Sequence, residues 1–164
     1  MRNAGILMPI TSLPSLWGVG TLGDAAFSFA DFLAQAGQSC WQVLPIGPTG
    51  YGDSPYQPFS SFAGNPYLIE LDRLREEGLL KEEEYRSLNW GEDPGRVDYG
   101  LLYQQRFPVL RKAVERLLCR NPGEVEAFCS QEFWWLDDYA LFMGLKGKFR
   151  DVSWSLCAGG RSRH

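Results

Sequence analysis

Histidine and paired cysteines are nearly absent from this 164-residue sequence. Its one histidine is the terminal His164, and the four cysteines are widely spaced with no C-x-x-C pair. A structural zinc site or a cysteine–histidine catalytic pair is therefore not expected. We expect the cysteines to be small, buried, apolar residues in a reducing, cytoplasmic setting.

Basic residues and extended apolar stretches are also few, which excludes two classes of partner. The net charge is −4 with only four lysines, so the sequence has no basic stripe of the kind that binds nucleic-acid phosphates. No apolar stretch approaches the roughly 20 residues of a membrane span. We expect no nucleic acid and no membrane as partners. Hydrophobic residues at 45% still suffice for a folded core.

The first 45 residues have the pattern of a strand, a helix and a second strand. Apolar runs at 4–8 and 40–44 flank a segment with apolar residues at helical spacing, which Gly37 should end. This order predicts a right-handed βαβ unit with two buried parallel strands. Loops 11–23 and 45–67 follow the two strands, so we expect them to share a rim at the end where such units bind ligands.

The loop Pro45–Ile69 carries the clearest sign of function. It is rich in Gly, Pro and Tyr and contains one charged residue, Asp53. A loop of this length without regular structure is usually functional when it is ordered. Tyrosine rings can cover the apolar faces of a sugar while Ser, Asn and Gln side chains hydrogen-bond its hydroxyls. The composition therefore predicts a surface that binds a neutral, hydroxyl-rich ligand.

After Leu71 the pattern becomes helical. Two short helices are expected over 71–80 and 81–88, and another over 98–105, followed by a helix that Pro108 starts or kinks. Asn121, Pro122 and Glu124 form a helix start. That helix should run to about Leu145, with a buried face that includes Phe128, Trp135, Tyr139 and Phe142. Residues from about 150 show no periodicity and are expected to be disordered.

Four blocks of the sequence carry a resemblance to a known family. They read ILMPITSLPS at 6–15, WQVLP at 41–45, GYGDSPYQ at 50–57 and GNPYLI at 64–69. In this order they resemble the start of the amylomaltases, the 4-α-glucanotransferases of glycoside hydrolase family 77. The likeness spans about residues 3–149. Members of the family are much longer, so we expect this chain to be an N-terminal fragment.

The resemblance implies an α/β fold, the N-terminal part of a (β/α)8 TIM barrel. Residues 1–70 would hold the first two barrel strands, their crossover helix and the sugar-binding loop. Residues 71–149 would form an inserted helical subdomain, and residues 150–164 a tail. The family transfers α-1,4-glucan segments between maltooligosaccharides or starch chains by a retaining double displacement, with no metal or organic cofactor. Its catalytic carboxylates lie on later strands, so none is expected here.

The motif positions also imply roles for individual residues. Tyr56 and Ser54 match residues that stack on and hydrogen-bond the sugar beside the scissile bond, although Tyr56 could instead be a packed loop anchor. Tyr51, with Tyr99, matches a remote glucan-docking site. Asp53 could accept a hydrogen bond from a sugar hydroxyl or form a turn.

Two further residues near these motifs have open interpretations. Asn65 could line the cleft, but fixing the exit of the loop is the simpler interpretation. Trp17 lies in the first rim loop and could belong either to the core or to the site.

The residues also permit two functions without catalysis. A retaining transfer needs two carboxyl groups about 5–5.5 Å apart. Asp137 and Asp138 are adjacent, and on a helix they would point about 100° apart. The chain could therefore be a catalytically inactive carbohydrate-binding fragment or a pseudogene product.

Overall fold

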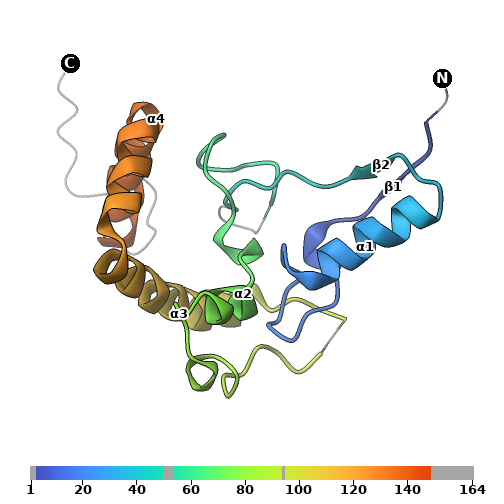
Figure 1. Ribbon diagram of the computed structural model, residues 1–164, viewed down its shortest axis with the longest axis horizontal. Helices are drawn as coiled ribbons and strands as arrows, with labels where there is room; N and C mark the ends of the chain where they lie inside the picture. Colours follow the sequence, from blue (N-terminus) through green and yellow to red (C-terminus); the bar gives the residue numbers. More distant parts are fainter. Residues whose placement is uncertain (1–2, 50–53, 94, 149–164) are drawn as a thin grey trace. The chain divides into compact units, whose positions relative to one another are not determined.

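The computed structural model describes residues 3–49, 54–93 and 95–148 (Figure 1). The chain divides into two compact units, Met1–Arg120 and Asn121–His164. The predicted division at residues 70 and 149 stays a prediction. Tyr51, Asp53 and the predicted disordered tail lie outside the described residues.

The first unit begins with the predicted βαβ arrangement. Strand β1 (Gly5–Leu7) pairs in parallel with β2 (Cys40–Gln42), with Ile6 opposite Trp41. Helix α1 (Asp24–Gln35) connects the strands and runs alongside them (Figure 1). It ends where Gly37 adopts a φ of 69°, a left-handed conformation that glycine takes without a steric penalty. The predicted strand–helix–strand order is confirmed.

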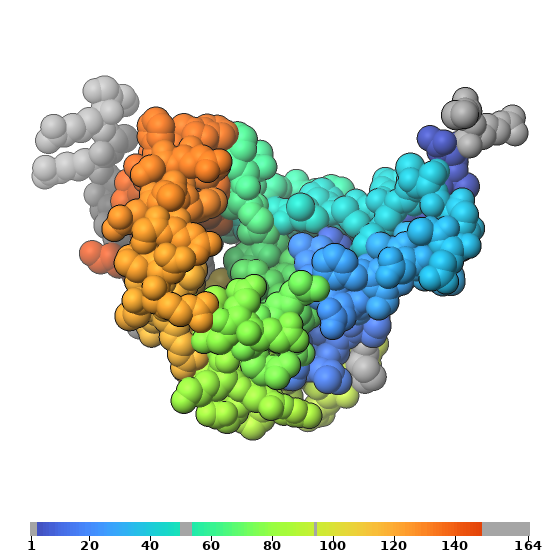
Figure 2. Space-filling view, in the orientation of Figure 1, coloured from blue at the N-terminus to red at the C-terminus, as the bar shows by residue number. Residues whose placement is uncertain are grey.

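A small core joins α1 to the sheet. Buried Ala26 and Leu33 of α1 face inward. The Phe29 ring packs edge-on against Trp41 of β2, with ring centroids 5.0 Å apart. Trp41 also donates its indole N–H to the Met8 carbonyl, at 2.9 Å. The outward side of α1, blue in Figure 2, forms open surface.

The two strands are more exposed than the sequence predicts. All three β1 residues are exposed, and Ile6 and Leu7 are 42% and 58% accessible. The prediction of buried strands is therefore wrong for this chain. Among the described residues the sheet has only two strands, so both of its edges are open. The prediction of buried cysteines is wrong for the same kind of reason, since Cys40, Cys119 and Cys129 all lie on uncovered surface.

Helices follow the long loop. Helix α2 (Leu71–Glu76) and a 3₁₀ turn at Glu82–Glu84 occupy the two predicted short helices. Helix α3 (Tyr99–Arg120) then runs without interruption through Pro108, so the prediction of two separate helices here is wrong, while a kink at this proline stays a prediction. A proline inside a helix costs about 3 kcal/mol. Burial of the α3 face on both sides of Pro108, at Leu102, Arg106, Val109 and Ala113, outweighs that cost.

An aromatic core lies beneath α2 and α3. The Trp17 ring meets Tyr85 edge-on at 4.8 Å and Trp90 at 6.3 Å. Aliphatic side chains surround these rings: Val19, Leu71, Leu79, Leu80, Leu102 and Val109. Burial of large rings contributes much of the stability of a small domain.

Helix α4 (Pro122–Lys148) is the described part of the second unit. Asn121 donates its side-chain N–H to Glu124 at 2.7 Å, so the predicted helix start is confirmed. The prediction that one face of α4 is buried is wrong, because no described residue of this helix is fully buried. Trp135 and Tyr139 are half-buried, and Phe128 is exposed. No helix among the described residues is long and apolar enough to cross a membrane.

A paired arginine and glutamate link α3 to the 3₁₀ turn. Arg116 donates to the two carboxylate oxygens of Glu84 at 2.6 and 2.7 Å. Glu84 also accepts from the Lys81 backbone N–H at 2.8 Å. These hydrogen bonds, that of Arg116 foremost, lower the pKa of Glu84 to about 2. A lowered pKa stabilises the folded state above the unfolded pKa of 4.5, and the stabilisation is lost as the pH falls towards 2.

We predict that Glu84→Gln lowers the urea midpoint at pH 7 by a few tenths of a molar, because it removes the charged partner of Arg116. The difference from the unsubstituted chain should shrink as the pH falls from 4.5 to 2. Urea unfolding followed by circular dichroism at several pH values measures it. Glu83→Gln, at an exposed neighbouring carboxylate, is the control. A difference that does not change with pH would refute the assignment.

Candidate functional site

The long loop between β2 and α2 is closed at its neck. The Asn65 N–H donates to the Ile46 carbonyl at 2.8 Å, which brings the two ends of the loop together. Its described residues, 46–49 and 54–65, contain no helix or strand, as predicted. A closed loop whose ends are fixed can present its side chains in one arrangement.

Two serines fold the interior of this loop. Ser54 Oγ accepts from the Tyr56 N–H at 3.4 Å, and Ser60 Oγ accepts from the N–H groups of Phe62 and Ala63 at 3.1 Å. Side chains of this kind satisfy backbone groups that have no strand or helix partner. The Tyr56 ring is 68% exposed, so it is not a packing anchor within the described structure.

Asn65 sits where the loop turns back into the core. Its Oδ1 accepts from the Tyr67 N–H at 3.0 Å and so caps the 3₁₀ turn Pro66–Leu68. Asn65 also lines a cavity. Asn65 therefore fixes the exit of the loop, as the simpler interpretation had it. Its place on the cavity also leaves room for a role in binding.

Tyr99, at the start of α3, lies against the exit of the loop. Its ring packs edge-on against buried Tyr67 at 5.8 Å, and Tyr67 in turn packs against Phe107 at 5.6 Å. Tyr99 is half-buried and also borders a separate hollow of about 820 Å³ formed by residues 89–101. Because Tyr51 lies outside the described residues, the predicted pairing of Tyr51 with Tyr99 stays a prediction.

The first rim loop contacts the second. The Leu22 N–H donates to the Leu68 carbonyl at 2.9 Å, and the Thr21 hydroxyl donates to the Glu70 carboxylate. Gly18 has a φ of 76°, and a Cβ there would lie 2.3 Å from the Trp90 carbonyl oxygen, so only glycine fits. Leu68 and Glu70 directly follow the second loop as predicted, so these contacts support the expectation that the two loops share a rim, which stays a prediction.

Trp17 belongs to the core, which settles its open interpretation. It is buried, and its indole N–H donates to Asp72 Oδ2 at 3.0 Å. Tyr85 donates its hydroxyl to Asp72 Oδ1 at 2.7 Å. Burial, followed by the Asp72 carboxylate, raises the pKa of Tyr85 to about 12, so the phenol stays a donor. Sequence reasoning missed Asp72, although a buried Trp and Tyr each require an acceptor.

Arg106 was also missed, and it is completely buried. Its guanidinium donates to the Trp17 carbonyl at 3.3 Å and to the Ile69 carbonyl. Burial lowers its pKa to about 10, so it remains charged at neutral pH. A signal was present in the sequence, because Arg106 falls at helical spacing between Leu102 and Val109 on the buried face of α3.

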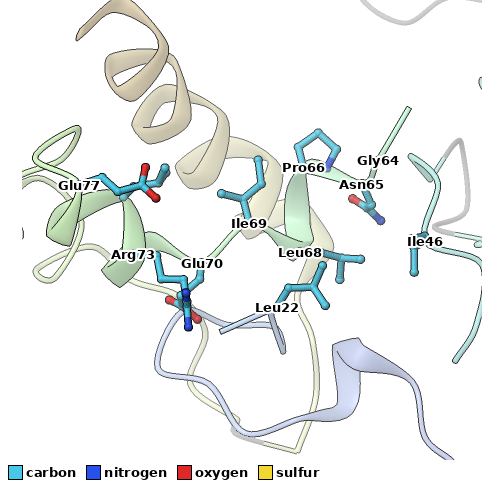
Figure 3. Close-up of a pocket in the computed structure, with 11 residues that line it drawn as sticks. Leu22, Ile46, Gly64, Asn65, Pro66, Leu68, Ile69, Glu70, Arg73 and Glu77 are labelled. Atoms are coloured by element: carbon cyan, nitrogen blue, oxygen red, sulfur yellow. The ribbon is translucent and has the colours of Figure 1, made fainter. Parts of the chain in front are cut away.

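A cavity of about 440 Å³ opens where the two rim loops meet (Figure 3). Leu22, Leu68 and Ile69 form much of its apolar lining, with Leu22 and Leu68 next to each other. Asn65 and Ile46 lie at one side of it, and Glu70, Arg73 and Glu77 at the other. An apolar lining with a few polar groups at the edge is typical of small-molecule sites.

Comparison with known proteins decides the family. The family model described as 4-α-glucanotransferase, glycoside hydrolase family 77, matches residues 8–160. The chain belongs to this family. The resemblance seen in the sequence motifs is confirmed.

Individual members of the family agree with this assignment. The 4-α-glucanotransferase of Clostridium butyricum is 49% identical over 90% of this chain, and that of Thermus thermophilus 51% identical over 94%. The chain spans 30% and 31% of the lengths of these two relatives. The amylomaltase from Streptococcus agalactiae, solved in complex with acarbose, matches 97% of this chain at 42% identity with a TM-score of 0.91. The match covers 32% of that amylomaltase.

We predict that Asn65→Ala destabilises the first unit by about 1 kcal/mol, the usual cost of losing a capping side chain. Asn65→Asp keeps the acceptor oxygen and should retain most of the stability. Urea unfolding followed by tryptophan fluorescence measures both variants. Equal losses in the two variants would show that the hydrogen bond to the Tyr67 N–H is not the stabilising contact.

Proposed function

We propose that this chain forms part of the glucan-binding wall of a 4-α-glucanotransferase. The observation that carries the proposal is the identity of about half the residues with enzymes of that name, over nearly the whole of this chain. The exposed Tyr56 ring beside Ser54 is what a surface for sugar rings requires. In this proposal the reacting carboxylates belong to the part of the family's length that this chain does not span.

The proposed reaction is a retaining double displacement. A carboxylate attacks the anomeric carbon of an α-1,4-glucan, an acid protonates the departing glucan, and a covalent glucosyl-enzyme forms. The 4-hydroxyl of a second glucan then displaces the carboxylate and gives up its proton to the same acid/base group. Maltooligosaccharides, starch or glycogen chains are the proposed substrates. Transfer exceeds hydrolysis when an acceptor docked nearby outcompetes water.

Within this proposal the predicted residues divide into two groups. Tyr56 stacks on the sugar beside the scissile bond, with Ser54, Asp53 and Asn65 supplying hydrogen bonds to its hydroxyls. Tyr51 and Tyr99 would hold a more distant part of the glucan. The exposure of Tyr56 and the position of Asn65 on the cavity support the first group.

The proposed fold and location follow from the same family assignment. We infer that β1 and β2 are the first two strands of a (β/α)8 barrel and that residues 71–149 are an inserted helical subdomain. The parallel pairing of β1 with β2 supports this inference. A cytoplasmic location fits the free, exposed thiols of Cys40, Cys119 and Cys129.

We predict that the chain binds maltoheptaose and that Tyr56→Ala weakens binding about tenfold, or ~1.4 kcal/mol, because the stacking ring is lost. Tyr56→Phe keeps the ring and should bind nearly as well. Phe133→Ala removes a comparably exposed ring on α4, 64% accessible against 68% for Tyr56, and is the matched control. Isothermal titration calorimetry measures all four affinities. No binding by the unsubstituted chain, or no loss in Tyr56→Ala, would contradict the proposal.

We also predict that this chain by itself transfers no glucosyl units between maltotriose molecules, because it would carry no pair of reacting carboxylates. Chromatography of the products after long incubation tests this. Glucose together with longer oligomers, from a preparation shown to be free of other enzymes, would refute it. Binding without transfer is also what the inactive carbohydrate-binding fragment predicts.

A further inference from the structure

We propose that Arg106 is a positioning residue that holds the two rim loops in the arrangement that binds glucan. The inference rests on the proposed function, since it concerns the same surface. Arg106 does not lie among the predicted sugar contacts. It would act through the backbone of both loops.

The geometry places one guanidinium between two segments that are distant in the sequence. Arg106 donates through Nη1 to the carbonyl of Trp17, 89 positions away in the first loop. It donates through Nη2 to the carbonyl of Ile69, 37 positions away, where the second loop ends. The planar guanidinium has a fixed fork of donors, so both carbonyls are held at once. A single side chain thereby sets the spacing of the two loops.

Ile69 is connected to the base of the sugar-binding loop through its chain neighbour Leu68 and two further hydrogen bonds. Ile69 follows Leu68, whose carbonyl accepts from the Leu22 N–H of the first loop. The turn Pro66–Leu68 is capped by Asn65, whose N–H closes the neck on Ile46. Ser54 and Tyr56 lie between Ile46 and Asn65 in the chain. A shift at Ile69 would therefore move the base of the segment that carries both residues.

Burying the Arg106 guanidinium costs free energy, which indicates that the side chain does more than fill space in the core. The side chain is completely buried, and its Nε has no hydrogen-bond partner among the described residues. Among the described residues its two hydrogen-bond acceptors are uncharged carbonyls, and the nearby Glu70 carboxylate favours its charged form through space. Whole buried ion pairs can often be replaced by apolar residues without loss of stability, so packing does not by itself call for a buried charge. Leu or Met could fill the same space in the core, but only a side chain with N–H donors can hydrogen-bond to both carbonyls.

Backbone positioning predicts an effect on affinity that lost stability does not. Binding is tighter when a loop is already held in its bound conformation, because less ordering is needed on association. Removing the donors should leave the loop free to sample other conformations. The affinity would then fall even under conditions in which the chain remains folded.

The test compares three variants of the full chain. Arg106→Met removes all donors but keeps an unbranched apolar stem, and Arg106→Lys keeps the charge without the fork. Val109→Ala removes buried carbons from the same face of α3 without touching either loop carbonyl, and it is the stability control. Each is measured for maltoheptaose affinity by calorimetry and for amide hydrogen exchange at Leu22 and Asn65, at a temperature where all are folded.

We expect Arg106→Met to weaken maltoheptaose binding about tenfold. It should also speed exchange at the Leu22 and Asn65 amides. Arg106→Lys should lie between Met and Arg, because its ammonium can reach only one carbonyl well. Val109→Ala should unfold earlier in urea while its affinity stays within about twofold of the unsubstituted chain.

Two results would overturn the inference. One is unchanged affinity and exchange in Arg106→Met, and the other is an equal loss of affinity in Val109→Ala. If Arg106→Met does not fold, Arg106→Lys carries the test, and unchanged affinity and exchange in it would overturn the inference. If the unsubstituted chain does not bind maltoheptaose, the proposed function fails. The exchange measurement then still decides whether Arg106 holds the loops.

Discussion

Three segments that are far apart in the sequence meet at the guanidinium of Arg106. Helix α3 supplies the side chain, the first rim loop supplies the Trp17 carbonyl, and the end of the second supplies the Ile69 carbonyl. Neither loop has a sheet neighbour to satisfy its backbone among the described residues. Buried carbonyls without partners are costly, so these loops depend on donors brought from elsewhere in the chain.

Two acidic residues at the start of α2 also hold the first rim loop and the core beneath it. Asp72 accepts from the Trp17 indole and the Tyr85 hydroxyl, and Glu70 accepts from the Thr21 hydroxyl and the Asp72 N–H. Buried polar networks of this kind give a core one preferred arrangement when their members are satisfied. The base of the loop is therefore fixed, while the Tyr56 ring remains exposed at its surface. Such a division suits a binding surface, because the contacting groups are presented by a rigid support.

Local patterns in the sequence explain which elements could be predicted. The apolar spacing of α1, the turn at Gly37 and the start of α4 at Asn121 each depend on neighbouring residues, and each was predicted correctly. A new helix was wrongly allowed to start at Pro108, because tertiary burial of α3 outweighs a local penalty. The strands β1 and β2 were correctly located but wrongly expected to be buried. Burial depends on what covers the sheet, and a local pattern does not contain that information.

Some residues of the candidate site could also be predicted from local motifs, and others could not. Ser54, Tyr56 and Asn65 stand out because their motifs are contiguous and specific to a family. The spacing of Arg106 on the buried face of α3 was a weaker signal and did not reveal its partners, which lie 37 and 89 positions away. The partners of Asp72 lie 13 and 55 positions away. Trp17 could be placed only once its ring was seen among Tyr85 and Trp90. Long-range polar contacts are the part of this site that sequence reasoning could not supply.

We propose that the rim loops form a sugar-binding surface on a fixed base. An amide chemical-shift titration of the isotope-labelled chain with maltoheptaose is the decisive experiment. We expect saturable shifts at Ser54, Tyr56 and Asn65, with little change along the exposed outer side of α1. Shifts that are absent, or confined to residues outside the two loops, would contradict it.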